Sequence, residues 1–417
     1  MGEGTRASIS LGALIIIAWV AGDLFERIRL PRITGYVLTG LILGPHLLNV
    51  IMAPSVSALK FIDNIALALI GLHTGQELQI SLLKKRFRSI LTLTFSLLLF
   101  TVGGSFVFVY FTGKYFLPFM ADASGSVLLV GAIIIAYLEG TKSPVSTIAI
   151  LDETNSSGAL SETTLGTVIF KDLIMALLLG VILAVCGNMI HLGEPGGILF
   201  SIFRFVTVSL SLGFIIGLVT GLCISFLRGG AYLVIIILAL FITATSHALH
   251  LEVLLVGGAA GFIIRNFSRG SENFLQGLGY STPFIYLLFF PVNAASLDLS
   301  LLGTLWKAAL LILALRFILV FGGVWFWSKL GKDFPAMRRY GWMGFLNQES
   351  VTMALALTIA HGLPELGEPV KALMLTMVVI SDLYAPAMFK YALYKSGEAG
   401  TRRTLAGKIF AKVKGSV

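Results

Sequence analysis

Long apolar runs separated by short polar stretches dominate the chain from residue 8 to residue 393. A run of about 20 apolar residues matches the length of an α-helix that crosses the hydrocarbon core of a bilayer. A helix also satisfies its backbone hydrogen bonds within the segment, as lipid requires. The pattern therefore predicts an all-α polytopic membrane protein. About thirteen transmembrane helices are expected, at 8–25, 33–50, 58–75, 89–113, 127–152, 160–187, 197–227, 230–247, 251–265, 275–295, 301–328, 338–361 and 368–393.

The composition supports lipid as the solvent. Of the 417 residues, 57% are hydrophobic and 12% are charged, whereas a soluble domain carries about 25% charged residues. The two cysteines, Cys186 and Cys223, exclude a disulfide scaffold and a cysteine-rich metal centre. The sequence shows no Gly-rich nucleotide-binding motif, so we expect no cofactor, no nucleotide and no ATP-driven transport. The net charge of +9 is not a nucleic-acid signal, because it is concentrated in particular loops.

The basic residues are unevenly distributed among these loops. Cytoplasmic loops of membrane proteins carry an excess of Lys and Arg. The loops after odd-numbered segments are basic and those after even-numbered segments are nearly bare, so we predict an external N-terminus and a cytoplasmic C-terminus in a cell inner membrane. The basic residues on the predicted cytoplasmic side are Arg27, Arg29, Arg32, Lys84, Lys85, Arg86, Arg88, Arg228, Arg269, Lys329, Lys332, Arg338, Arg339, Lys395, Arg402, Arg403, Lys408, Lys412 and Lys414.

Two polar interruptions occur at corresponding places in the two halves of the chain. Transporters are often built from two inverted repeats with paired interrupted helices at the membrane midplane. With segment 7 as a linker, an offset of seven segments inverts the topology. We therefore predict a first repeat at 1–187, a linker helix at 188–229, a second repeat at 230–394 and a basic cytoplasmic tail at 395–417.

The first interruption lies in segment 5 and the second in segment 12. Proline removes a helix hydrogen bond and glycine lowers helix propensity, so both segments are expected to be broken crossover helices. Such a pair indicates where a substrate binds. The interrupting residues are Glu139, Gly140, Thr141, Lys142, Ser143 and Pro144 in segment 5, and Gly344, Asn347, Gln348, Glu349 and Ser350 in segment 12.

Charged residues also lie deep in segments 6 and 13. Lys171 and Asp172 interrupt one apolar run, and Asp382 interrupts the other. Ionisable groups inside a membrane are costly and usually functional. Arg204, Lys307 and Arg316 lie in apolar runs too, and we expect them to snorkel or to brace helix interfaces. The spacing of Gly35, Gly40 and Gly44 in segment 2 predicts close helix packing.

Several motifs resemble those of one family. Residues 30–45, LPRITGYVLTGLILGP, are similar to the P-x-x-x-G-Y-x-x-x-G-x-x-x-G-P second helix of the monovalent cation:proton antiporter superfamily, which contains the Na+/H+ exchangers and their potassium-transporting relatives. Residues 66–78 resemble its G-L-E-L run, and residues 141–144 its T-S-P crossover. Residues 289–298 resemble a later F-F…G-x-x-L-D stretch, so the resemblance spans about residues 10–390.

The resemblance implies a homodimeric secondary transporter, not an enzyme, in which Asp172 binds both the proton and a metal ion, Na+ or K+. The family has two adjacent acids, Asn-Asp or Gln-Asp where this chain has Lys171-Asp172. It also carries a basic residue in the second broken helix, where this chain has Asn347-Gln348-Glu349. One interpretation is a relocated ion pair, joining Lys171 or Lys142 to Glu349 or Asp382.

Three functions follow from these residues. The first is exchange of a monovalent cation for protons by alternating access. The second is transport of an anion or organic acid with Lys142 and Lys171 as counter-charges, and the third is a non-transporting membrane sensor. Four acids and two bases give the proposed site a formal charge of −2, which favours a cation. The candidate ion- and proton-binding residues are Glu139, Thr141, Lys142, Ser143, Lys171, Asp172, Asn347, Glu349 and Asp382.

Overall fold

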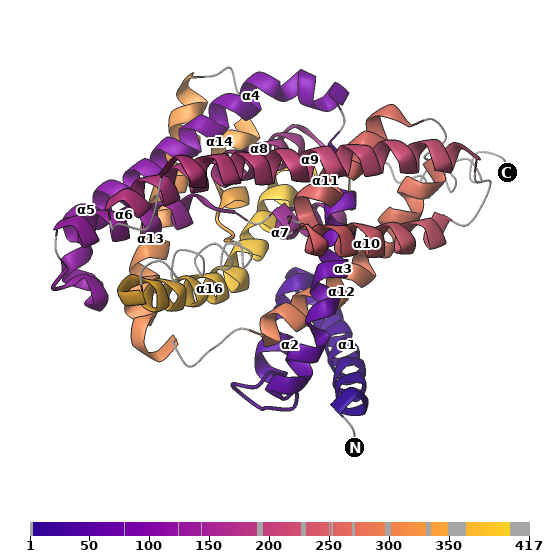
Figure 1. Ribbon diagram of the computed structural model, residues 1–417, viewed down its shortest axis with the longest axis horizontal. Helices are drawn as coiled ribbons and strands as arrows, with labels where there is room; N and C mark the ends of the chain where they lie inside the picture. The colour runs from indigo at the N-terminus through magenta and orange to yellow at the C-terminus, as the bar shows by residue number, and fades with distance from the viewer. Residues whose placement is uncertain are drawn as a thin grey trace.

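The protein is helical throughout the part of the chain that the computed structural model describes (Figure 1). The described residues are 3–78, 80–123, 125–142, 144–189, 195–226, 231–249, 251, 253–268, 272–296, 302–330, 335–348 and 364–400. The helices are α1 (Glu3–Arg27), α2 (Arg32–Leu43), α3 (Ala53–Glu77), α4 (Ile80–Leu98), α5 (Gly104–Phe116), α6 (Gly125–Gly140), α7 (Pro144–Glu153), α8 (Ala159–Met189), α9 (Pro195–Phe226), α10 (Ala231–Ala248), α11 (Val253–Phe267), α12 (Glu272–Ala295), α13 (Leu302–Leu330), α14 (Pro335–Tyr340) and α16 (Pro364–Ser396).

These helices coincide with the apolar segments predicted from the sequence. Segment 4 is one continuous path through α4, the π-helical turn η1 (Leu99–Gly103) and α5. The two short segments at 230–247 and 251–265 are separate helices, α10 and α11. Segment 12 is described as far as residue 348, through α14 and the 3-10 turn η3 (Gly341–Phe345).

The surface of the helices confirms a polytopic membrane protein. Within the described residues, six stretches are long and apolar enough to cross a bilayer, and four shorter apolar helices accompany them. Large apolar side chains face outward on several of these helices, where lipid would cover them. The six stretches are Ser8–Arg27, Arg86–Phe116, Gly125–Glu153, Val206–Ile224, Leu305–Lys329 and Ala372–Ser396.

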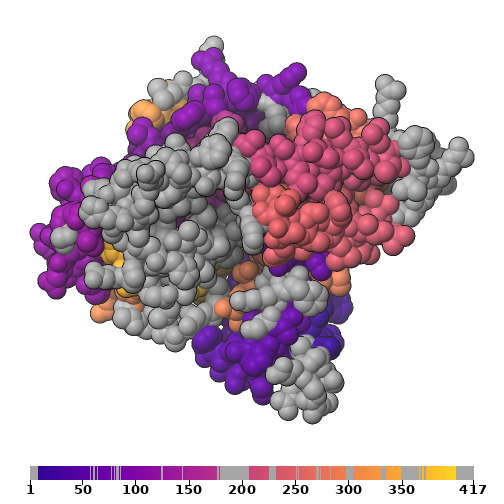
Figure 2. Space-filling model, in the orientation of Figure 1, coloured from indigo at the N-terminus to yellow at the C-terminus, as the bar shows by residue number. Residues whose placement is uncertain are grey.

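The helices form two groups that contact each other directly through α2 and α16 and also through α7. One group contains α1, α2, α3 and α10–α12, with α9 packed against α11; the other contains α4–α6, α8, α13, α14 and α16. In the space-filling view, rose and salmon atoms of α9–α11 occupy one flank and violet atoms of α5 and α6 the opposite one (Figure 2). α7 lies in the middle of Figure 1 and contacts α2, α3 and α12 as well as α8 and α16.

Glycines allow the first group to pack closely, as predicted for segment 2. A Cβ at Gly35 would lie 2.9 Å from the backbone of Ala21 on α1, and one at Gly40 would lie 2.2 Å from the Pro291 carbonyl oxygen on α12. The contact between α3 and α11 is equally tight, since a Cβ at Gly75 would lie 2.0 Å from the carbonyl oxygen of Gly258. Small residues thus let these helix backbones touch.

Both predicted helix interruptions are present. α6 ends at Gly140 and α7 begins at Pro144, the first-turn position that proline favours. Thr141 and Lys142 between them are not helical. In the second half, η3 ends at Phe345, Leu346 is its C-cap with dihedrals in the right-handed helical region, and Asn347 and Gln348 are not helical. The described chain is therefore interrupted at two buried places, which leaves backbone carbonyls available to other donors. We call residues 139–142 the first crossing and residues 346–348 the second crossing.

Candidate functional site

Arg316, from the middle of α13, joins the two crossings. Its side chain is fully buried. At the first crossing its Nη1 donates to the Glu139 carbonyl oxygen and its Nη2 to that of Thr141 at 2.8 Å. At the second, its Nε donates to the Leu346 carbonyl oxygen at 3.0 Å. Its Nη2 also lies 3.3 Å from the Asn347 carbonyl oxygen. One guanidinium group therefore satisfies carbonyls that the broken helices leave unpaired.

Two further side chains link the crossings to each other. Gln348 Nε2 donates to Glu139 Oε1 at 2.8 Å, and both side chains are almost completely buried. The second carboxylate oxygen of Glu139 lies 3.8 Å from Nη1 of Arg316. The carboxylate is thus compensated by one cation and one amide, as a buried charge requires.

Lys171 lies on α8 beside this cluster. Its side chain is 1% exposed, and its ammonium group makes no hydrogen bond within the described part of the chain. Glu139, Asp172 and Arg316 all act on it electrostatically. Asp172, the next residue on α8, is only partly buried. The structure therefore brings the predicted pair on segment 6 close to the first crossing.

Lys142 is directed elsewhere. Its Nζ donates to the Thr147 hydroxyl group on α7 and lies 5.8 Å from the centre of the Phe345 ring and 6.0 Å from that of Phe389. It is buried, so the aromatic faces supply part of the electrostatic compensation that water would give. Thr141 contributes its carbonyl oxygen to Arg316, while its hydroxyl group donates to the carbonyl oxygen of Leu138.

The remaining predicted site residues have different outcomes. Asn347 is buried, and its side-chain amide makes no hydrogen bond among the described residues. Asp382 on α16 is partly buried and makes no ion pair with any described residue. The ion pair predicted between Asp382 and Lys142 or Lys171 is therefore not found in the structure. Ser143 and Glu349 lie outside the described residues.

Sequence reasoning placed Arg316 at an interface without connecting it to the site. The structure confirms that it braces an interface and shows that this interface is the pair of crossings. A lone arginine within the apolar run 301–328 was the available signal, because a charge at that depth needs a partner. Tyr384 on α16, which acts electrostatically with Arg316 and Glu139, carried no such signal.

Comparison with known proteins agrees with this architecture. The sequence model of the family described as "Sodium/hydrogen exchanger, transmembrane" matches residues 12–394. The chain belongs to the sodium/hydrogen exchanger family. The resemblance noted from the motifs is therefore correct, and the match includes both crossings and the Lys171-Asp172 pair.

Two relatives illustrate the family. The chain is 27% identical to "Probable Na(+)/H(+) antiporter 3" of Methanocaldococcus jannaschii over 176 residues, which is 41% of this chain and 40% of that protein. The solved structure of the sodium proton antiporter MjNhaP1 from Methanocaldococcus jannaschii at pH 8 superposes with a TM-score of 0.69 at 17% identity. That superposition covers 94% of this chain and 99% of MjNhaP1, so the two share a fold.

Proposed function

We propose that this exchanger-family protein moves a monovalent cation, Na+ or K+, in exchange for protons, with Asp172 as the group that both ions bind in turn. The observation that carries the proposal is the buried cluster of Glu139, Lys171 and Arg316 beside Asp172, at the two crossings of an exchanger fold. Relatives named as Na+/H+ antiporters support the same reaction.

Competition for one carboxylate couples the two ions. A dehydrated cation in low dielectric needs oxygen ligands and negative charge, and a carboxylate supplies both. The same carboxylate can hold a proton instead, so bound cation and bound proton exclude each other. Asp172 is only partly buried, unlike its neighbour Lys171, so an ion can approach it more readily.

Arg316 restricts where the cation binds. The carbonyls of Glu139, Thr141 and Leu346 already accept hydrogen bonds from its guanidinium group, and its positive charge repels a cation there. The cation is therefore assigned to the Asp172 side of the crossings. Adding Arg316 to the predicted set changes its formal charge from −2 to −1, which still favours a cation over an anion.

Lys171 takes the role of internal counter-charge. With no cation bound and a proton on Asp172, its ammonium group is the counter-charge of Glu139, which acts on it electrostatically. A cation that displaces the proton from Asp172 repels the neighbouring ammonium group of Lys171. This repulsion lowers the proton affinity of Lys171, which then releases its own proton. Lys171 would then add to the protons exchanged per cation.

The remaining parts of the proposal concern the whole protein. It acts as a homodimer in the inner membrane, with the N-terminus outside and the C-terminus in the cytoplasm. Residues 1–187 and 230–394 form inverted repeats joined by the linker 188–229. Alternating access comes from movement of the helices that carry the crossings against the other group, in which the glycine-rich α3–α11 contact forms a rigid unit.

Transport assays in proteoliposomes test the reaction. A cation gradient should drive proton movement that a pH-sensitive dye reports, and Asp172→Asn should abolish it. Asp122→Asn, an equivalent change at an exposed loop residue, should leave the flux unchanged. Undiminished cation-driven flux in Asp172→Asn would overturn the site. Flux that depends only on an anion would favour the transporter in which Lys142 and Lys171 are counter-charges.

A further inference from the structure

α8, the helix that carries Lys171 and Asp172, directly follows a glycine in the chain. Gly158 precedes its first residue, Ala159, and has no side chain that could accept a hydrogen bond from the first turn. Its φ of +153° is one that glycine readily adopts. The first N–H groups of a helix have no acceptor within the helix. They need acceptors from elsewhere, especially where the helix start is partly buried.

Glu398, just beyond the end of α16, supplies those acceptors. Its Oε1 accepts from the Leu160 N–H at 2.7 Å, and its Oε2 accepts from the Ser161 N–H at 2.8 Å. The Ser161 hydroxyl group donates to the same Oε2 at 2.7 Å. A Cβ at Gly158 would lie 2.4 Å from the carboxyl carbon of Glu398. Glycine at position 158 therefore leaves the space that this carboxylate occupies.

The same end of α16 also holds the connection between α7 and α8. The Ser157 N–H donates to the Glu398 carbonyl oxygen at 3.3 Å, and the Gly400 N–H donates to that of Thr154 at 2.9 Å. Lys390 donates to Glu153, the last residue of α7, at 2.7 Å. We name Lys390, Glu398 and Gly400 the C-terminal clasp.

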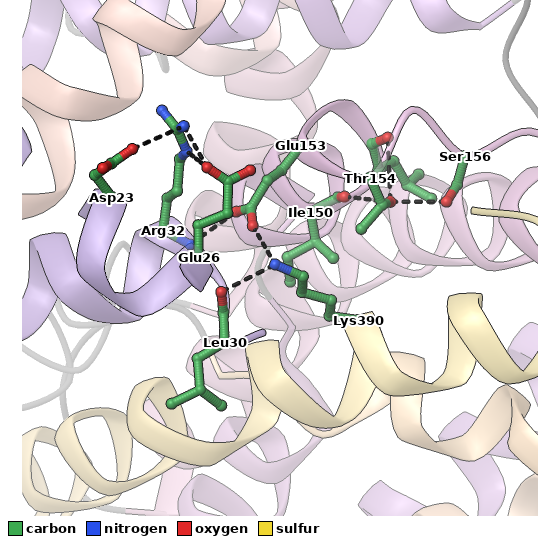
Figure 3. Close-up of polar contacts among 10 residues, drawn as sticks. Asp23, Glu26, Leu30, Arg32, Ile150, Glu153, Thr154, Ser156 and Lys390 are labelled. Carbon is green, nitrogen blue, oxygen red and sulfur yellow. Dashed lines mark hydrogen bonds and ion pairs between the residues drawn. The ribbon is translucent and has the colours of Figure 1, made fainter. Parts of the chain in front are cut away.

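The clasp also reaches the first group of helices. Figure 3 shows Lys390 between Glu153 and the carbonyl oxygen of Leu30, to which it donates at 2.9 Å. The Arg32 N–H at the start of α2 donates to the other oxygen of Glu153 at 2.9 Å. The Lys390–Glu153 pair is almost fully buried, which strengthens its electrostatic attraction relative to a surface pair.

We propose that the C-terminal clasp is a positioning element of the transporter, with Glu398 acting as the remote N-cap of α8. The proposal rests on the proposed function, since the helix that it holds carries Asp172. Asp172 is 13 residues beyond Ala159, or about 20 Å along a helix, so Glu398 acts through α8 without touching the ion. The clasp joins α7, α8 and α16 into one unit.

Hydrogen exchange and transport together test the clasp. In Glu398→Ala, amide exchange at residues 160–163 should rise about tenfold, the effect of losing a typical cap. Turnover per folded molecule should fall about fivefold while the apparent KM for the cation stays within about twofold. Glu398→Gln, which keeps the length of the side chain and one acceptor oxygen, should lose less than Glu398→Ala in both measurements.

Matched variants separate the clasp from general instability. Glu162→Gln removes an acid from the same first turn, where it pairs with Arg86 on α4 at 3.4 Å, and should leave turnover unchanged. A chain ending at Gly400 should behave as the full chain, whereas one ending at Gly397 should behave as Glu398→Ala.

Two results would overturn the proposed role of the C-terminal clasp. One is unchanged amide hydrogen exchange at residues 160–163 in Glu398→Ala, and the other is normal turnover in the chain ending at Gly397. Hydrogen exchange does not require flux. If the wild-type protein shows no cation-driven flux, the proposed function is refuted. The hydrogen-exchange measurement would still test whether Glu398 caps α8.

Discussion

The buried side chain of Arg316 donates hydrogen bonds to five carbonyl oxygens, those of Glu139, Thr141, Phe345, Leu346 and Asn347. A guanidinium group can do this because its five N–H donors lie in a fixed plane, whereas an ammonium group has three donors at a single point. Geometry as well as charge therefore determines the residue type at this position.

Arg316→Lys should consequently destabilise the fold although it keeps the charge. Loss of several donors leaves buried carbonyls unpaired, at a cost of about 3 kcal/mol in the free energy of unfolding. Denaturation in detergent measures the loss, and Arg265→Lys, at an exposed residue on α11, serves as the control. Wild-type stability would mean that lysine or water satisfies the carbonyls equally well.

Lys171→Met should have the opposite effect on stability. The Lys171 ammonium group is buried and makes no hydrogen bond among the described residues, so an apolar side chain of similar size removes its desolvation cost, while Glu139 keeps Arg316 as a counter-charge. The fold should therefore be stabilised by about 1–3 kcal/mol. The same change should reduce the number of protons exchanged per cation, which the reversal potential in proteoliposomes reports. Lys307→Met, at an exposed lysine on α13, should alter neither quantity. Lower stability would instead identify Lys171 as a stabilising ion-pair partner.

For single residues, burial could be predicted from the sequence, but contact partners could not. Polar groups inside apolar runs identified Glu139, Lys142 and Lys171 as buried, because the cost of burial applies whatever their partners are. The partners themselves did not follow. Arg316 lies 177 positions from Glu139, and Gln348 lies 209 positions from it, so only folding brings them together. Glu398 gave no signal, since its role depends on a missing side chain at Gly158.

At the scale of elements, the closest contact in the first group is between α3 and α11. The backbones of Gly71 and Gly75 face those of Gly257 and Gly258, with no room for a side chain between them. Helix positions and the two interruptions could be predicted from local periodicity and from Pro and Gly. The pairing of α3 with α11 could not be predicted in this way. Glycine spacing marks a helix face that permits close packing, but it does not show which helix packs against that face.

Gly75→Ala should therefore destabilise the protein by about 1–3 kcal/mol, since its Cβ would overlap the Gly258 carbonyl oxygen. Gly12→Ala on α1 has nothing within 4 Å of the added Cβ and should be neutral or slightly stabilising. Thermal unfolding of both variants in the same detergent provides the comparison. Equal melting temperatures would show that α3 and α11 can separate without cost.

At the scale of the whole molecule, the charge pattern predicts how the chain lies in the membrane. In a background without Cys186 and Cys223, Ser8→Cys should react with an impermeant maleimide added to intact cells. Lys395→Cys should react only after permeabilisation. Both positions are exposed in the structure. The reverse pattern would invert the topology and place the C-terminal clasp on the external face.

The bond between Arg316 and the first crossing also constrains how the protein is made. The carbonyl of Glu139 enters the bilayer 177 residues before its guanidinium donor is synthesised. During that interval the half-built chain contains an unpaired polar crossing that lipid cannot solvate. The early helices must therefore stay loosely packed, or be shielded from lipid by the insertion machinery, until α13 is inserted. Arg316 on α13 then donates the hydrogen bonds that the first crossing lacks.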